Sequence, residues 1–164
     1  MKRSIKTILA FAVAAAVMIL VVSPAVSQDK PADNMQILRE KIKADKKLLV
    51  ASDMKLTESE AKAFWPVYEK YQHELFLLRT RTVKLINDYA DAYEKMTNDK
   101  AKALLDELMK IDSLGLKLHQ AYLPKFREVL PEVKVVRYYQ IENKINAALM
   151  YELAANIPLM KAAQ

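Results

Sequence analysis

Apolar residues recur through the middle of the chain at alternating steps of three and four, the spacing of helices that pack along one seam. One run starts at Ala61 and another at Ala101, and Thr97-Asn98 forms the turn between them. So short a connection makes neighbouring helices antiparallel, so we expect a long helical hairpin. The seam positions are Ala61, Phe64, Tyr68, Tyr71, Leu75, Leu78, Thr82, Leu85, Tyr89, Ala92 and Met96 in the first run, and Ala101, Leu104, Leu108, Ile111, Gly115, Leu118 and Tyr122 in the second.

Start and stop signals divide the chain into four helices. Thr57 can cap the second helix, and Glu60 three residues later completes a capping box. Pro131 suits the first position of the last helix, and Pro158 cannot continue it. Because no strand pattern occurs, the predicted fold class is all-α, a long antiparallel helical hairpin with a short N-terminal helix and a C-terminal helix. The predicted helices cover residues 34–50, 57–96, 98–129 and 131–155.

Two prolines fall on the polar side of the hairpin at nearly the same level. Pro66 and Pro124 each remove one backbone hydrogen bond and push away the carbonyl four residues earlier. One interpretation is that this bends both helices toward the apolar face and makes a shallow cradle. The other is that Pro66 marks a broken start and that the second helix effectively begins there.

A second apolar stripe lies beside the seam on each long helix, and both stripes fall on one face of the hairpin. A hairpin alone buries only its seam, so this face needs a cover. The first helix, the last helix, a second copy of the chain or an outside partner could each supply it. The candidate client- or partner-binding residues on this face, with one arginine and one histidine among them, are Trp65, Phe76, Arg79, Val83, Ile86, Met109, Leu116, His119 and Leu123.

The first 27 residues have the layout of a secretory signal peptide. A basic start precedes an apolar run from Ile8 to Val22, and Ala25-Val26-Ser27 offers a small-residue cleavage site. The run is about 15 residues, short of the roughly 20 that span a bilayer, so we favour cleavage over a membrane anchor. We therefore expect residues 1–27 to be removed and residues 28–164 to form a single helical domain in the periplasm, without a membrane span.

Composition narrows the classes of function. The leader carries three of the 26 basic residues and none of the 20 acidic ones, which leaves 23 against 20 and a net charge of +3. This weak charge, together with export, argues against a nucleic-acid partner. The chain has no cysteine and one glycine, so it offers no thiol chemistry, phosphate-binding loop or nucleophile elbow. We therefore predict that the protein is not an enzyme.

The few other candidates for chemistry have simpler explanations. His73 falls on the polar face of the hairpin and His119 on the apolar face, so we expect no shared metal site. The methionines show no metal-binding spacing, so neither a metal nor a cofactor is predicted. Lys134 belongs to a basic stripe on the last helix, for which the ordinary account is ion pairing with glutamates near the start of the second helix.

Two short motifs carry a resemblance to a known family. "LTESE" opens the hairpin and "VLPEVK" opens the last helix, in an exported chain without cysteine. From about Leu56 to Met150 the chain resembles the Spy/CpxP-like family of small periplasmic proteins, marked by a repeated Leu-Thr-x-x-Gln motif at two helix starts. Glu60 stands in place of the first glutamine, and Lys134 stands where the second is sought. The motif positions are Leu56, Thr57, Glu60, Leu130 and Pro131.

The resemblance implies an ATP-independent chaperone or envelope-stress regulator, usually a dimer with a curved helical face that binds clients. Some members bind zinc or nickel, which the placement of the two histidines here does not favour. We therefore expect an exported homodimer that binds unfolded or partly folded proteins. The alternative is a structural or signalling dimer of the envelope with its apolar face buried, with a metal sensor as a more distant possibility. Whether that face is open or covered separates the first two.

Overall fold

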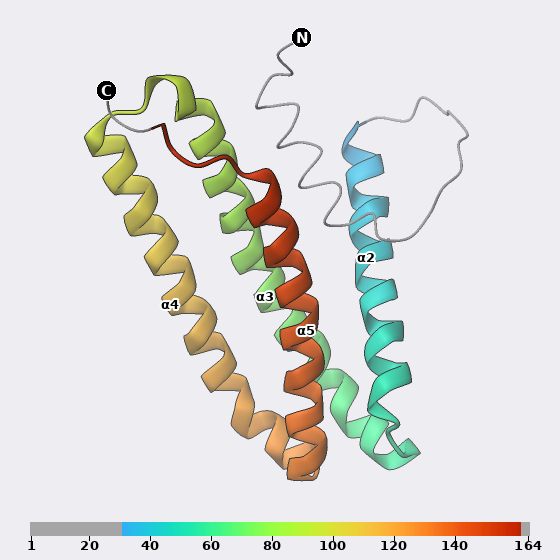
Figure 1. The fold of residues 1–164 in the computed structure, drawn as a ribbon. Helices are drawn as coiled ribbons and strands as arrows, with labels where there is room; N and C mark the ends of the chain where they lie inside the picture. The colour runs from blue at the N-terminus through green and yellow to red at the C-terminus, as the bar shows by residue number, and fades with distance from the viewer. Residues whose placement is uncertain (1–30, 162–164) are drawn as a thin grey trace.

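The computed structural model describes residues 31–161 and shows the predicted all-α fold (Figure 1). No strand occurs within that range, and none of its helices combines the length and hydrophobicity needed to cross a bilayer. The predicted signal peptide, residues 1–27, lies outside the described residues. The elements are α2 (Pro31–Met54), α3 (Glu58–Ala92), the 3₁₀ turn η1 (Tyr93–Lys95), α4 (Asn98–Val129) and α5 (Glu132–Asn156).

Helices α3 and α4 form the predicted antiparallel hairpin. A Cβ built on Gly115 would lie 3.6 Å from Leu78 Cδ2, so these two seam positions face each other. Helix α3 ends at Ala92 rather than at residue 96, because its last turn tightens into η1. Thr97 then caps α4, accepting a hydrogen bond from the Lys100 backbone nitrogen at 3.2 Å.

Neither proline interrupts its helix. Helix α3 runs unbroken from Glu58 through Pro66, and α4 runs through Pro124. The interpretation that the helix begins at Pro66 is therefore wrong. The capping box at Thr57 is complete, since its hydroxyl accepts from the Glu60 nitrogen at 3.3 Å and its own nitrogen donates to Glu60 Oε2 at 2.7 Å. Figure 1 shows both long helices curving at the end of the hairpin that holds these prolines.

The other two helices explain where the core lies. Helix α5 returns along one face of the hairpin (Figure 1). Helix α2 contacts α5 near the end of the hairpin where α3 begins. Aromatic rings fill this end, with Phe126 and Tyr138 centroids 4.6 Å apart and Phe64 and Tyr138 centroids 5.2 Å apart. The buried cluster is Val50, Met54, Phe64, Tyr68, Tyr71, Leu75, Tyr122, Phe126, Leu130, Val135, Tyr138 and Ile141.

Other predicted boundaries also differ from the structure, and α2 begins at Pro31 rather than at residue 34. Helix α2 continues past residue 50 to Met54, so the connection to α3 is only residues 55–57. Pro131 is the N-cap of α5 rather than its first helical residue, with φ −58° and ψ 146°. Its carbonyl accepts the first backbone hydrogen bonds of the helix, from the nitrogens of Lys134 and Val135.

Candidate functional site

The predicted apolar face of the hairpin is the face that α2 and α5 approach, and the two helices cover it unevenly. Ile86, expected to be available to a partner, is buried with 8% of its surface exposed. Val83, Met109 and Leu116 are exposed, at 38%, 54% and 60%. The half-buried residues of the set are Trp65, Phe76, Arg79, His119 and Leu123. The structure therefore leaves only part of this face open, in contrast to a cradle that is open throughout.

Helix α2 shields two of the aromatic side chains. Lys47 Nζ lies 5.1 Å from the centroid of the Trp65 ring, and Lys43 Nζ lies 5.4 Å from that of Phe76. Ammonium groups over ring faces gain cation–π attraction, while their aliphatic stems cover apolar surface. Two lysines of α2 thus take part in covering this part of the face.

Helix α5 covers the centre of the face. The Tyr139 hydroxyl donates to the His119 backbone oxygen at 3.0 Å, and Leu123 packs against the core cluster. Burial lowers the pKa of His119, because the charged imidazolium loses its hydration there. His73 lies exposed on the opposite face. No group of three potential ligands among the described residues could hold a metal ion.

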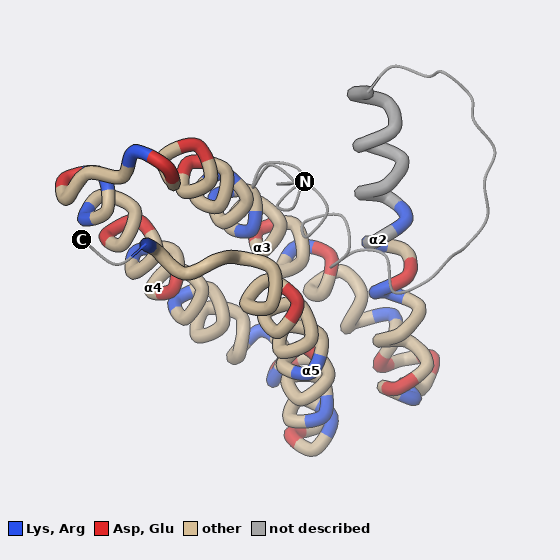
Figure 2. Tube along the Cα trace, turned by 45° about the horizontal axis from the view of Figure 1, so that its top comes forward, with Lys and Arg blue, Asp and Glu red and all other residues tan. Residues whose placement is uncertain are grey.

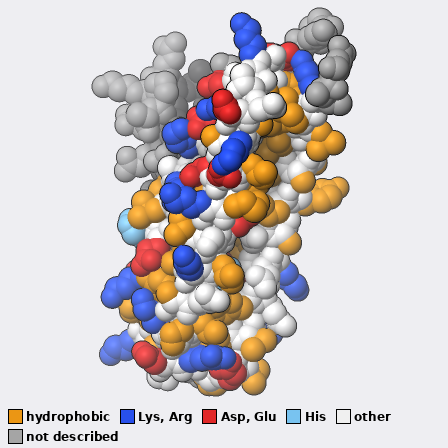
Figure 3. Space-filling model, turned by 90° about the vertical axis from the view of Figure 1, so that its left-hand side faces the viewer, with side chains coloured by type: hydrophobic (Ala, Val, Ile, Leu, Met, Phe, Trp, Pro, Cys, Tyr) orange, Lys and Arg blue, Asp and Glu red, His pale blue; other side chains and the backbone are white. Residues whose placement is uncertain are grey.

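The open apolar surface follows α4 toward the hairpin tip, meaning the end where η1 joins α3 to α4. Leu105, Leu108, Met109 and Leu116, which we call the α4 edge, are between 38% and 60% exposed. Figure 3, viewed from the α4 side, shows hydrophobic side chains in clusters between basic and acidic side chains. Charges of both signs are spread over the described helices, without a single-sign region (Figure 2). The α4 edge is therefore an exposed apolar surface surrounded by side chains of both charges.

Sequence reasoning missed Leu77, which is 55% exposed on the face expected to be polar. It lines a shallow hollow together with Leu78, Leu114 and the stem of Arg81. Arg81 closes one side of the hollow through an ion pair with Glu107, at 2.6 Å from Nη2 to Oε1. The repeat could have indicated this exposure, because Leu77 lies off both apolar stripes.

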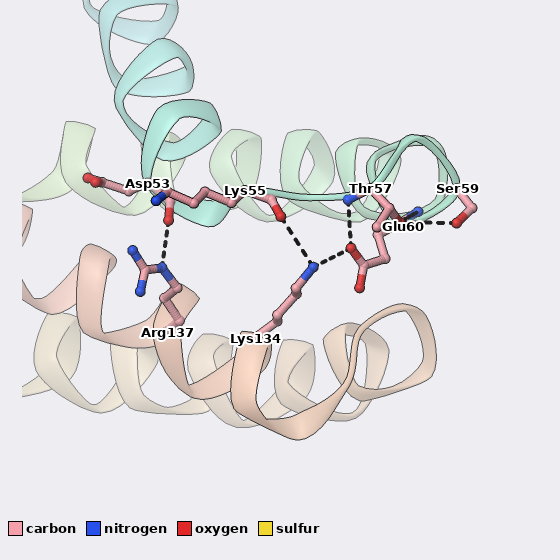
Figure 4. A network of polar contacts seen from close by, with 7 residues as sticks. All are labelled: Asp53, Lys55, Thr57, Ser59, Glu60, Lys134 and Arg137. Carbon is pink, nitrogen blue, oxygen red and sulfur yellow. Dashed lines mark hydrogen bonds and ion pairs between the residues drawn. The ribbon is translucent and has the colours of Figure 1, made fainter.

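The two motif copies meet in one polar network (Figure 4). Lys134 reaches from α5 to the Glu60 carboxylate and to the Lys55 backbone oxygen, the latter at 3.3 Å. Arg137 Nε donates to the Asp53 backbone oxygen at 2.5 Å. The hydrogen bond from Lys134, and after it the one from the Thr57 backbone nitrogen, lower the pKa of the Glu60 carboxyl group. The predicted ion pair between Lys134 and a glutamate at the start of α3 is thus confirmed.

This network clamps the α2–α3 connection onto α5. Lys55 has a backbone φ of 46°, a left-handed conformation that costs energy for a residue other than glycine. Its carbonyl is one of the two acceptors of Lys134, so the clamp holds the strained turn. Leu130 is buried and Leu56 packs against the core, so each motif also delivers a leucine to the interior. The motif residues therefore form a structural joint.

A buried polar cluster between α2, α3 and α5 was not predicted. Lys46 Nζ donates to Gln72 Oε1 and to Glu142 Oε2, both at 2.8 Å, and Gln72 Nε2 donates to Glu142 Oε1 at 2.9 Å and to the Tyr138 hydroxyl at 3.2 Å. Glu142 is only 5% exposed, and desolvation lowers the pKa of Lys46. No buried side-chain nitrogen or oxygen in the described residues lacks a partner. The cluster also gives the segment 135–145, unassigned from sequence, a role in joining α5 to α2.

Comparison with protein-family models, curated proteins and solved structures found no match to the chain.

Proposed function

We propose that the protein is an exported, ATP-independent binding protein for partly folded polypeptides of the periplasm, a chaperone-like role. The α4 edge is the observation that carries this proposal. Its three leucines and one methionine are partly exposed along α4 between residues 105 and 116, and none of them belongs to the buried cluster. Apolar side chains that lie together on a surface favour contact with other apolar chains. The signal-peptide layout and the resemblance to Spy/CpxP-like proteins support the periplasmic location.

The form of the surface also favours a polypeptide as the ligand. The hollow beside Leu77 and the one beside His73 and Tyr122 are shallow, whereas small-molecule sites enclose most of their ligand. Methionine adapts its shape to varied partners, and Met109 stands at the centre of the α4 edge. Lys110 and Asp112 next to it are exposed and supply charges of both signs. Such a surface suits clients of varied sequence.

A second candidate is a structural or signalling homodimer of the envelope. It rests on the same α4 edge, because a second copy could cover these side chains as well as a client could. Under that function the exposed leucines would be buried permanently and would not be free to hold a client. The two candidates therefore predict different behaviour for one set of substitutions.

The test is the suppression of aggregation of a chemically denatured client by the mature protein at near-stoichiometric ratios without nucleotide, followed by light scattering. The double variant Met109→Asp/Leu116→Asp should fold normally, because both side chains are more than half exposed, and should protect the client less. Leu77→Asp is the matched control, since Leu77 is similarly exposed on the opposite face and should leave protection unchanged.

Full protection by the folded double variant would contradict the chaperone-like proposal. Sedimentation then tests the second candidate. That candidate requires that the wild-type protein be a dimer and that the double variant be a monomer. Circular dichroism of each variant verifies that its helices are intact.

A further inference from the structure

The chain leaves α5 at Asn156 and its residues 157–161, which we call the tail, cross the hairpin tip (Figure 1). The Tyr89 hydroxyl donates to the Pro158 backbone oxygen at 2.8 Å, and the Tyr93 hydroxyl donates to the Leu159 backbone oxygen at 3.1 Å. Lys161 pairs with Glu94, and its Nζ lies 5.4 Å from the centroid of the Tyr93 ring. The hairpin tip thus holds a non-helical piece of polypeptide at three successive points.

These contacts recognise a main chain more than a sequence. Both tyrosines donate to backbone carbonyls of consecutive residues, which any polypeptide presents. Leu159 is 90% exposed, so its side chain contributes little to the docking. Main-chain hydrogen bonds supply affinity in peptide recognition, and side-chain pockets supply specificity. Ile157 and Pro158 are half-buried, so the site combines these main-chain hydrogen bonds with a limited amount of side-chain contact, which leaves room for variation in sequence.

The tyrosines are well placed for this task. Tyr89 and Tyr93 lie one helical turn apart, with ring centroids 5.7 Å apart, so their hydroxyls can meet consecutive carbonyls of a chain that crosses them. Leu105 and Leu108, in the first turns of α4, belong to the same end of the hairpin. The tip therefore continues into the α4 edge.

We propose that Tyr89, Tyr93 and Glu94 form a binding site for a non-helical client segment that carries a basic residue, and that the tail occupies this site in cis. The inference rests on the proposed function and adds the place of client docking and its regulation. A tethered segment acts at an effective concentration in the millimolar range. A client must therefore displace the tail. Proteins that are folded, or that expose little non-helical chain, are kept off the site.

The absence of cysteine from the chain allows a direct test on the full-length mature protein. A nitroxide spin label on Leu159→Cys reports on the tail, because Leu159 is exposed and its replacement breaks no contact. The probe is a peptide with the sequence of residues 153–164, added at millimolar concentrations. We expect the label to be less mobile than the same label on the free probe peptide, because the backbone of the tail is held, and to become more mobile in a saturable way as the probe displaces the tail.

Two further variants sharpen the result. Tyr89→Phe/Tyr93→Phe keeps both rings and removes both hydroxyls, so the label should be mobile before any probe is added, and the probe should change little. A label on Tyr151→Cys, in α5 and 74% exposed, should not respond to the probe. A label on Leu159→Cys that is as mobile in the otherwise wild-type protein as on the free peptide, or one whose mobility stays unchanged at every probe concentration, would overturn the proposal.

The spectra also separate this inference from the proposed function. A tail that the probe displaces in a protein without any protective effect would keep the peptide site and refute the chaperone-like role. Conversely, protection of a client without any change at the Leu159→Cys label would keep the role and refute the site at the tip.

Discussion

At the scale of single residues, Gly115 shows how a seam position sets the distance between two helices. A Cβ at this position would lie at ordinary van der Waals distance from Leu78 Cδ2, 3.6 Å away. There is room for one methyl group and no more along that direction. The backbone is helical without a positive φ, so glycine is required there by neither conformation nor an unavoidable clash.

We expect Gly115→Ala to stabilise the protein by up to about 1 kcal/mol, because alanine loses less backbone entropy in a helix and its methyl group fits. Gly115→Leu should overpack the layer and cost about 1–3 kcal/mol. Urea unfolding measures both free energies. A leucine variant as stable as wild type would show that the seam is not assigned correctly, whereas a destabilised alanine variant would show that Leu78 cannot yield.

At the scale of elements, α2 is held to the other helices by both apolar and polar contacts. Among its residues whose burial is described, Val50 and Met54, near its C-terminal end, belong to the buried cluster. Closer to the N-terminus of α2, Lys46 pairs with Glu142 in the buried polar cluster. Lys47 pairs with Glu69 at the surface, at 2.6 Å. Side-chain exposure is 11% and 6% in the first pair and 43% and 61% in the second.

Removal of one partner from the buried pair should therefore be far more costly than removal of one from the surface pair. Glu142→Ala leaves the Lys46 ammonium group buried and unpaired, and we expect it to cost about 3–5 kcal/mol. Glu69→Ala is the matched control and should cost no more than about 1 kcal/mol. Chemical denaturation of the two variants gives the comparison. Equal losses would mean that Glu142 is not desolvated in solution and that α2 is docked less closely.

The same helices show what the sequence could predict. Local spacing was enough to predict the α3–α4 seam. In a hairpin, the position of the turn and the apolar repeat together determine which residues of the two helices face each other. The cover of that hairpin was not predictable. Ile86 and Leu116 fall on equivalent stripes, yet they are 8% and 60% exposed, and such a difference arises only once the rest of the chain is placed. Lys46 and Glu142 carry no local signal either, as an ion pair becomes visible only when two distant helices are placed together.

At the scale of the whole molecule, the two ends of the hairpin differ. Four helices and an aromatic core build the end near Phe126, and the opposite end is the hairpin with the tail across it. The joint at Glu60 and Lys134 belongs to the first end, and the α4 edge and the tip extend toward the second. This division lets one end fix the fold while the other exposes apolar side chains, and it places the exposed region where substitutions disturb the core least.

The proposed function requires that the protein reach the periplasm, so the last prediction concerns export. The protein isolated from its host should begin at or within a few residues of Gln28, as intact-mass spectrometry of the periplasmic fraction would show. Ser27→Tyr replaces the small residue before the expected cut, so it should leave an uncleaved precursor at the membrane, while Ser23→Tyr, away from the cut, should still be processed. Wild-type protein that retains Met1 in the membrane fraction would contradict the periplasmic assignment and favour an anchored protein whose tip and α4 edge act close to the bilayer.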